Sequence, residues 1–218
     1  MKKILFLVSG NGGNLKFVHN YFNLMPQSQA EFYCVSDRDC GGLTFCEEIE
    51  IEIESYKITY SRANPQNLQR IISSINPDVI ITNWHKIIDP DTINLFRDKF
   101  INLHYSLLPL FGGVIGVAPI EKAYSNKCKF SGVTCHKVDE GVDTGEIISQ
   151  AIFKTDIPIT DAFDKSFRAG CIILLDSIFK ILNYKVEISV EQYEGILFSP
   201  EVNLDLSCID ETFWNKIK

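Results

Sequence analysis

The sequence predicts an α/β fold, in which helices cover both faces of a mostly parallel β-sheet. Short apolar runs alternate with amphipathic stretches along most of the 218 residues, a pattern typical of βαβ units. A glycine-rich turn, Gly10–Asn14, directly follows the first apolar run, as expected where a strand leads into a helix. The composition, 45% hydrophobic and 22% charged, is typical of a globular protein and excludes collagen-like and disordered classes.

In the N-terminal half, each apolar run is interpreted as a buried strand and each amphipathic stretch as a helix. The strands are expected at residues 3–9, 32–35, 79–82 and 100–104. The helices are expected at residues 15–24, 43–50, 65–75 and 89–96. Prolines mark several helix boundaries. Pro26 follows the first expected helix, Pro65 opens the third, and Asp89-Pro90 starts the fourth.

One segment of this half allows two interpretations. Residues 49–54 alternate isoleucine with glutamate, which favours a strand with one solvent-facing side, yet the residues before them have helical character. A short third strand is expected to begin at Ile58.

The C-terminal half begins with a glycine-rich segment, residues 108–117, which predicts a long loop over a site. Strands are expected at residues 132–138 and 146–153, and helices at residues 118–125 and 162–182, the second with Gly170 inside it. Short strands and a final amphipathic turn complete the chain. We therefore expect one main domain, residues 1–185, with a C-terminal extension, residues 186–218, packed on it.

Charge and cysteine content exclude several classes of protein. With 21 Lys and Arg against 28 Asp and Glu, the net charge is −7, which disfavours nucleic acid as a partner. The seven cysteines form no CxxC pair and indicate neither a disulfide framework nor a zinc site, so no metal is expected. The apolar run Ile4–Val8 is too short for a signal peptide, and no window is long enough to span a membrane. A cytoplasmic protein without membrane contact is expected.

The first chemical feature is the loop that joins the first strand to the first helix. Glycines let a backbone approach a ligand closely, and a helix N-terminus presents N–H groups, so phosphate suits this loop. The spacing differs from GxGxxG, which disfavours a dinucleotide, and a tight turn without a ligand is the alternative. The candidate residues are Gly10, Asn11, Gly12, Gly13 and Asn14.

The second feature is NLHYSLLP, residues 102–109. Asn102 and His104 are two positions apart on an expected strand, so their side chains project to the same face. An imidazole suits proton transfer, and an amide N–H suits an oxygen that gains negative charge. A structural histidine at a strand end is the alternative.

The third feature is the acidic loop VDEGVDTGE, residues 138–146. Its positions do not fit an EF-hand, which disfavours calcium. One of its carboxylates is suited to orient His104, but the spacing does not say which. A solvated acidic loop is the alternative.

Together, NxHxSLLP and the later aspartate in VDEGVDTG resemble the folate-dependent formyltransferases. This family includes glycinamide ribonucleotide transformylase, the catalytic domain of methionyl-tRNA formyltransferase and the sugar-nucleotide N-formyltransferases. The resemblance covers residues 2–182. It implies a Rossmann-like sheet of the formyltransferase type and an enzyme that uses 10-formyltetrahydrofolate as formyl donor.

The resemblance also implies a catalytic trio of Asn102, His104 and Asp143. An amine would attack the formyl carbon, Asn102 and protonated His104 would stabilise the oxyanion, and Asp143 would hold the histidine and order a water. The implied folate contacts are Trp84, His85, Lys86, Ile87, Ile88, Val138, Asp139, Glu140 and Gly141.

The acceptor is expected to be a small amine that carries phosphate. The glycine-rich loop is similar to the phosphate loop of glycinamide ribonucleotide transformylases. However, Tyr105 replaces the proline usual after the histidine, and Ala169 or Gly170 stands where a ribonucleotide-contacting glutamate is expected. A nucleotide-linked amino sugar is therefore favoured, with Tyr105 as a further acceptor contact that stacks on a base. Phosphoribosylglycinamide is the alternative.

Three further expectations concern other activities and assembly. A formyltetrahydrofolate hydrolase, in which water is the acceptor, and a non-catalytic folate binder are remote alternatives. The intact set Asn102, His104 and Asp143 disfavours a pure binder, which needs no proton-transfer pair. A homodimer is the expected form of any oligomer.

Overall fold

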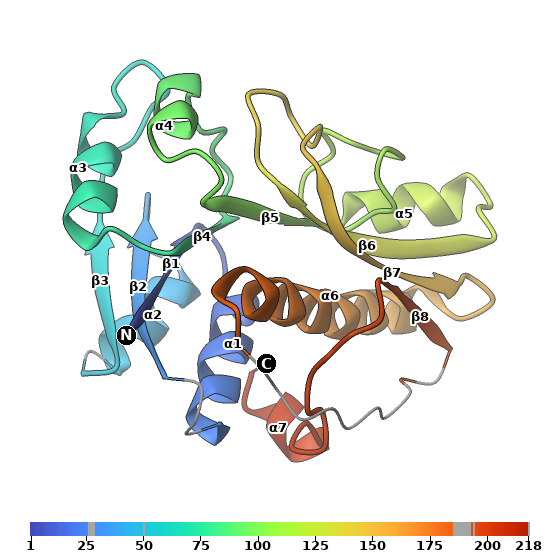
Figure 1. Ribbon diagram of the computed structural model, residues 1–218. Helices are drawn as coiled ribbons and strands as arrows, with labels where there is room; N and C mark the ends of the chain where they lie inside the picture. The colour runs from blue at the N-terminus through green and yellow to red at the C-terminus, as the bar shows by residue number, and fades with distance from the viewer. Residues whose placement is uncertain (26–28, 50, 185–192, 194, 218) are drawn as a thin grey trace. The chain divides into compact units, whose positions relative to one another are not determined.

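A computed structural model describes residues 1–25, 29–49, 51–184, 193 and 195–217 (Figure 1). The chain forms two compact units, Met1–Asn102 with Asn215–Lys218, and Leu103–Trp214. The boundary between these units lies after Asn102, inside a strand. The expected division after residue 185 falls at residues 185–192, which lie outside the described part of the chain. The C-terminal extension up to Trp214 belongs to the second unit, because its contacts are with that unit.

The first unit is built on parallel strands that follow the order β3-β2-β1-β4-β5. These strands are β1 (Lys2–Val8), β2 (Ala30–Ser36), β3 (Ile53–Lys57), β4 (Val79–Asn83) and β5 (Phe100–His104). In β1, Ile4 pairs with Phe32 of β2 on one side and with Val79 of β4 on the other. Residues 4–8 of this strand are at most 1% exposed, because helices cover both faces of the sheet.

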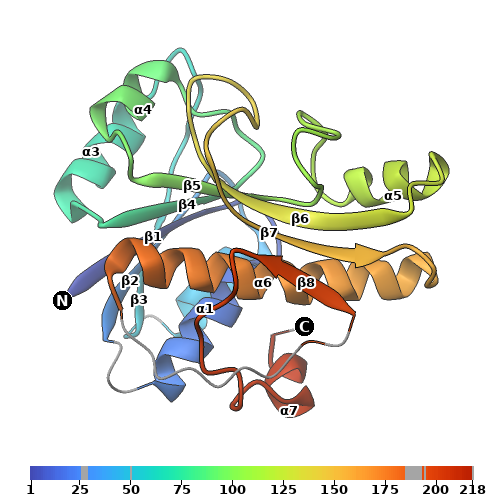
Figure 2. The ribbon, with the colours of Figure 1, turned by 45° about the vertical axis from the view of Figure 1, so that its right-hand side comes forward.

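The helices of the first unit lie on both faces, as the sequence predicts. Figures 1 and 2 show α1 (Gly13–Leu24) and α2 (Gly41–Glu48) on one face, with α3 (Gln66–Ile75) and α4 (Pro90–Leu95) on the other. The expected start of α4 is confirmed, since the Asp89 carboxylate accepts a hydrogen bond of 2.9 Å from the Thr92 N–H. The α/β fold with a mostly parallel sheet is therefore confirmed.

The prediction of a third strand that begins at Ile58 was wrong. Strand β3 ends at Lys57, and it takes up the last part of the ambiguous isoleucine–glutamate segment. Ile53 of this strand pairs with Phe32 and is fully buried, whereas Glu54 faces solvent. The alternation of isoleucine and glutamate thus correctly indicated a strand, and a turn at residues 51–52 separates β3 from α2.

The glycine-rich loop packs directly against the start of α2. The Gly42 N–H donates a hydrogen bond of 2.9 Å to the carbonyl of Gly10. Gly12 has a left-handed backbone with φ of 72°, and a Cβ atom there would lie 2.6 Å from the Gly42 Cα. Two requirements therefore select glycine at position 12, the positive φ and the close approach of α2.

The second unit carries antiparallel strands and a long central helix. Its strands are β6 (Phe130–Lys137), β7 (Ile147–Lys154) and β8 (Ile196–Ser199), in which β7 pairs with both neighbours. Its helices are α5 (Ala118–Ser125), α6 (Ile159–Leu182) and α7 (Glu211–Asn215), the last ending at the unit boundary. The helix α6 begins three residues before its expected start and packs on β6 and β7.

Described residues of the C-terminal extension pack on α6 (Figure 2). The Asn203 N–H donates a hydrogen bond of 2.9 Å to the Asp176 carboxylate of α6. Arg168 of α6 forms an ion pair with Glu211, and its guanidinium lies 5.0 Å from the Trp214 ring centroid. Because α6 is covered on several sides, 14 of its 24 residues are buried.

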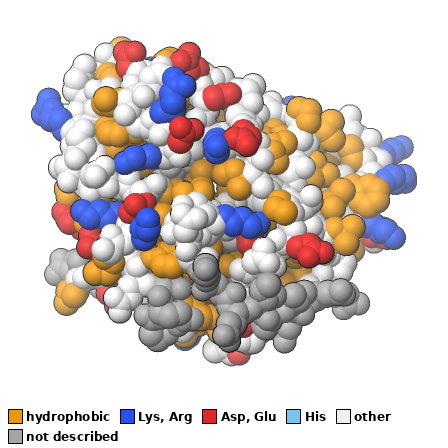
Figure 3. Space-filling model, viewed as in Figure 1, with side chains coloured by type: hydrophobic (Ala, Val, Ile, Leu, Met, Phe, Trp, Pro, Cys, Tyr) orange, Lys and Arg blue, Asp and Glu red, His pale blue; other side chains and the backbone are white. Residues whose placement is uncertain are grey.

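The described part of the chain contains no helix long and apolar enough to cross a membrane. Among the same residues, no cluster of His, Cys, Asp and Glu is arranged to hold a metal ion. On the face shown in Figure 3, acidic and basic side chains are interspersed.

Gly12→Ala is expected to lower the free energy of unfolding by at least about 2 kcal/mol. The added methyl group meets the Gly42 backbone and forces a left-handed backbone on a residue with a Cβ atom. Gly10→Ala is the matched control, because a Cβ atom there meets nothing within 4 Å, and it should change stability by no more than about 0.5 kcal/mol. Urea unfolding measures both, and equal effects would contradict the packing argument.

Candidate active site

The strand β5 carries the first two members of the predicted trio, and the unit boundary falls between them. Asn102 is described with the first unit, where its Oδ1 atom accepts a hydrogen bond of 3.1 Å from the Thr82 hydroxyl. The same hydroxyl also lies 3.2 Å from the Ile101 carbonyl oxygen; with Oδ1 turned toward Thr82, the donor end of the amide is Nδ2. Thr82 itself comes from the neighbouring strand β4, which pairs with β5.

His104 lies two positions further along β5, and its imidazole is held at both nitrogens. Its Nδ1 atom is 3.2 Å from Asp143 Oδ2, and its Nε2 atom is 3.2 Å from the carbonyl oxygen of Phe111. The side chain is 7% exposed. Both partners are acceptors, so they match an imidazolium with two N–H donors better than a neutral ring with one.

Asp143 connects three segments of the second unit. It accepts a hydrogen bond of 2.8 Å from the Gly113 N–H, and its Oδ1 atom is 3.5 Å from Nε2 of His136 on β6. Both residues that face the His104 ring have left-handed backbones, with φ of 55° at Asp143 and 58° at Phe111. Such conformations cost free energy for residues with a side chain, and they are kept where the surrounding structure requires them.

Opposing effects set the pKa of each partner in this pair. For His104, burial outweighs the attraction of Asp143 and the Phe111 carbonyl, and lowers its pKa below the ordinary value of 6.5. For Asp143, burial alone would raise the pKa. Hydrogen bonds from His136 and Gly113 and the nearby imidazoles outweigh burial and lower it. At neutral pH the resting pair is therefore a neutral imidazole beside a carboxylate.

The geometry of the acidic loop shows which carboxylate faces the histidine. Asp139 points into the loop instead, where its Oδ1 atom accepts hydrogen bonds from the Gly141 N–H at 3.0 Å and the Thr144 hydroxyl at 2.7 Å. Gly145 is required for close packing, because a Cβ atom there would lie 1.9 Å from the Lys137 carbonyl. Asp139 thus shapes the loop, and Asp143 contacts His104.

The predicted folate segment lies in the first unit, directly after β4. Trp84 is 8% exposed and packs on Tyr60 with ring centroids 5.0 Å apart, and Ile88 is 4% exposed. Ile87, by contrast, is 47% exposed. Within the described residues, the buried Trp84 Nε1 and Asn83 Oδ1 atoms have no hydrogen-bond partner. This segment therefore combines an orphaned donor and acceptor with an exposed apolar side chain, a combination compatible with a flat heterocycle that has a polar edge, such as a pterin.

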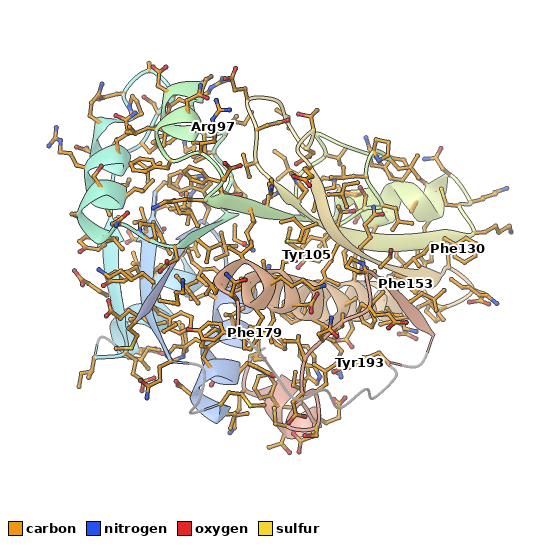
Figure 4. All side chains as sticks on the ribbon, viewed as in Figure 1. Arg97, Tyr105, Phe130, Phe153, Phe179 and Tyr193 are labelled. Carbon is orange, nitrogen blue, oxygen red and sulfur yellow. The ribbon has the colours of Figure 1, made fainter. Side chains whose placement is uncertain are left out.

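The structure places Tyr105 beside α6. A Cβ atom at Gly170 of α6 would lie 3.6 Å from the Tyr105 ring and 2.9 Å from a methyl group of Leu103. Figure 4 labels Tyr105 at this helix. Gly170 therefore stands inside the helix because these two side chains occupy the space that a larger residue would fill.

The predicted site residues fall into two groups. The second unit contains His104, Tyr105, Asp143 and the loop residues Val138–Gly141, and it brings His104 and Asp143 into contact. The first unit contains Asn102, the glycine-rich loop and the segment Trp84–Ile88.

Sequence reasoning missed three groups that contact this pair. They are the imidazole of His136, the carbonyl of Phe111 and the N–H of Gly113. A histidine on an expected strand was a visible signal for the first. Backbone groups of a loop leave no signal in residue type, so the other two required the tertiary structure.

Comparison with known proteins adds the family. A family model described as "Formyl transferase" matches residues 2–165, so the chain belongs to the formyl transferase family. The predicted family resemblance is therefore confirmed.

Two curated relatives and one solved structure illustrate the range of this family. The chain is 29% identical to the formyltetrahydrofolate deformylase of Escherichia coli (strain K12) over 144 residues, 64% of this chain and 50% of the relative. It is 30% identical to the methionyl-tRNA formyltransferase of Clostridioides difficile (strain 630) over 166 residues, 74% of this chain and 53% of the relative. It is 26% identical to the structure of phosphoribosylglycinamide formyltransferase from Streptococcus pneumoniae TIGR4, with a TM-score of 0.69, covering 84% and 99% of the two chains. The chain spans about half the length of the curated relatives it matches.

For the formyl transfer proposed below, His104→Ala is expected to lower turnover at least about 100-fold, because it removes the imidazole that would exchange the proton. Formyl transfer under saturating substrates measures this effect, and a urea unfolding curve checks that the fold is retained. Turnover within threefold of the unaltered enzyme would exclude proton transfer by His104.

The pH dependence of kcat/KM should show an acid limb with a pKa below 6.5, because only the neutral imidazole accepts a proton. Asp143→Asn should move this limb to still lower pH, since the charge of Asp143 raises the pKa of His104, and should lower the maximal rate. Glu146→Gln is the control in the same loop, where Glu146 pairs with Lys137 at 2.7 Å. An acid limb that stays in place in Asp143→Asn would refute the coupling.

Proposed function

We propose that this chain transfers the formyl group of 10-formyltetrahydrofolate to the primary amine of a small, phosphate-bearing acceptor. The observation that carries the proposal is the buried contact between His104 and Asp143, with the imidazole neutral at rest and both ring nitrogens facing acceptors. Formyl transfer to an amine requires a group that takes up a proton as the new C–N bond forms and gives a proton to the departing folate nitrogen as the old C–N bond breaks. The His104–Asp143 pair is suited to both steps.

The proton is taken up by His104. The neutral imidazole has one N–H for two acceptors, so one of its ring nitrogens is left to take up a proton. The amine delivers this proton at Nε2, after it displaces the Phe111 carbonyl from that nitrogen. Asp143 stabilises the resulting imidazolium and keeps the ring in place, because its carboxylate is itself held by the Gly113 N–H.

The Asn102 amide stabilises, by a hydrogen bond, the formyl oxygen that gains negative charge during transfer. The carbonyl end of this amide faces the Thr82 hydroxyl, and an amide N–H is a donor suited to such an oxygen. The folate supplies the activated formyl group when bound. Ile87 and the orphaned polar atoms of Asn83 and Trp84 are suited to hold its ring system.

The first candidate acceptor is phosphoribosylglycinamide. It is favoured because the Streptococcus pneumoniae protein of that activity is similar over 84% of this chain. The nucleotide-linked amino sugar favoured by the sequence finds no specific support among the named relatives. It is kept as the second candidate, because Gly170 and Ala169 are fully buried or closely packed by Leu103 and Tyr105, and neither offers a charged contact to a ribonucleotide.

Water is the third candidate acceptor. The Escherichia coli relative is named a deformylase, and the same histidine–aspartate pair can activate water in place of an amine. A homodimer, the absence of nucleic-acid partners and a cytoplasmic location remain predictions.

A panel assay with 10-formyltetrahydrofolate tests the proposal. The acceptors offered are phosphoribosylglycinamide, several nucleotide-linked amino sugars and water alone, with mass detection of the formylated amine and absorbance detection of the folate product. We expect a formylated product with one phosphate-bearing amine and loss of that activity in His104→Ala. Folate turnover without any formylated amine would identify a hydrolase, and no turnover with any acceptor would overturn the proposal.

A further inference from the structure

A polar network joins the ends of three segments in the first unit. The Ser9 hydroxyl donates a hydrogen bond of 2.7 Å to Asp37 Oδ1 and accepts one of 3.1 Å from the His85 N–H. Asp37 follows β2, Ser9 follows β1, and His85 follows β4. The network therefore ties the start of the glycine-rich loop to the predicted folate segment and to the residues after β2.

Asp37 holds the guanidinium of Arg38 in a bidentate contact. Arg38 Nε lies 3.1 Å from Asp37 Oδ1, and Arg38 Nη2 lies 2.8 Å from Oδ2. The Asp37 side chain is 3% exposed, whereas that of Arg38 is 45% exposed. One edge of the guanidinium is thus fixed on a buried carboxylate, and the remaining N–H groups at Nη1 face away from it.

The local charge is positive although the whole chain is acidic. Lys86 Nζ lies 3.8 Å from Asp37 Oδ2, so two cations surround one carboxylate. The next acidic residue, Asp39, is already paired with Lys57. Burial would raise the pKa of Asp37, but Arg38, Ser9 and Lys86 outweigh it and keep the carboxyl ionised. The cluster therefore retains one uncompensated positive charge beside the glycine-rich loop.

We propose that Arg38 binds the phosphate group of the acceptor together with the glycine-rich loop, and that Asp37 is a positioning residue for Arg38. The identity of the acceptor in this proposal rests on the proposed function. The presence of an anion site at Arg38 does not. Ser9 directly precedes Gly10 and is one hydrogen bond from Asp37, which places the held guanidinium next to the loop. A guanidinium with one fixed edge suits phosphate, because little side-chain entropy remains to be lost on binding.

Steady-state kinetics with the acceptor found in the panel provide the first test. Arg38→Gln is expected to raise the KM for the acceptor about tenfold and to leave the KM for 10-formyltetrahydrofolate within twofold. Lys57→Gln is the matched control, since it removes a cation at the end of the neighbouring strand β3, and should change neither constant by more than twofold. All measurements are made at one ionic strength, because exposed charges are screened by salt.

The positioning role of Asp37 is tested by coupling. Asp37→Asn should raise the KM for the acceptor in the unaltered chain but have little further effect in Arg38→Gln. Additive effects of the two substitutions would show that Asp37 acts independently of Arg38 and would remove its positioning role. Arg38→Lys should restore only part of the loss, since lysine cannot make the bidentate contact.

Direct binding of inorganic phosphate and pyrophosphate, followed by calorimetry, separates this proposal from the proposed function. Both probes should bind the unaltered protein, and Arg38→Gln should weaken them at least fivefold while Lys57→Gln does not. Tighter binding of pyrophosphate than of phosphate would indicate a nucleotide-linked acceptor. Equal binding of the two anions would indicate an acceptor with a single phosphate group. The proposal is overturned if neither anion binds, or if Arg38→Gln and Lys57→Gln have equal effects. Arg38-dependent anion binding without formyl transfer would leave the site standing and reject the proposed function alone.

Discussion

The candidate site depends on a histidine that is withdrawn from water while both its ring nitrogens face oxygen acceptors. Burial favours the neutral ring, whereas Asp143 and the Phe111 carbonyl favour the protonated one. Burial outweighs the other two effects and lowers the pKa of His104, so the resting ring is neutral and can take up a proton. Much of the loop structure in the second unit, including two left-handed residues, places these acceptors around the ring.

In the first unit, polar side chains gather at the C-terminal ends of the parallel strands. Such ends leave polar backbone groups at one edge of a sheet, where ligands of open α/β folds bind. Here the edge is organised by side-chain hydrogen bonds, from Thr82 to Asn102 and from Ser9 to Asp37. These contacts orient an amide and a guanidinium, so the chemistry of the edge comes from residues on several strands.

Net charge alone is a poor guide to what such a protein binds. The chain carries a net charge of −7, yet Arg38 and Lys86 surround a single buried carboxylate next to a glycine-rich loop. Local arrangement therefore permits an anionic ligand on an acidic protein.

The burial of helix α6 also depends on residues distant in sequence. Residues after 195, which the sequence identified only as an extension, cover part of its surface.

The sequence by itself determined the α/β class, the bounds of β5 and α5, and the position of Asn102 and His104 two residues apart on the same strand. These follow from periodicity and capping, which act between residues close in the chain. Only the tertiary structure decided that His136 and the Gly113 N–H hold Asp143, that α2 contacts Gly12, and that Gly170 makes room for Leu103. Each of these depends on a contact between residues far apart in sequence, and the path of the chain that brings them together has no signature in local residue pattern.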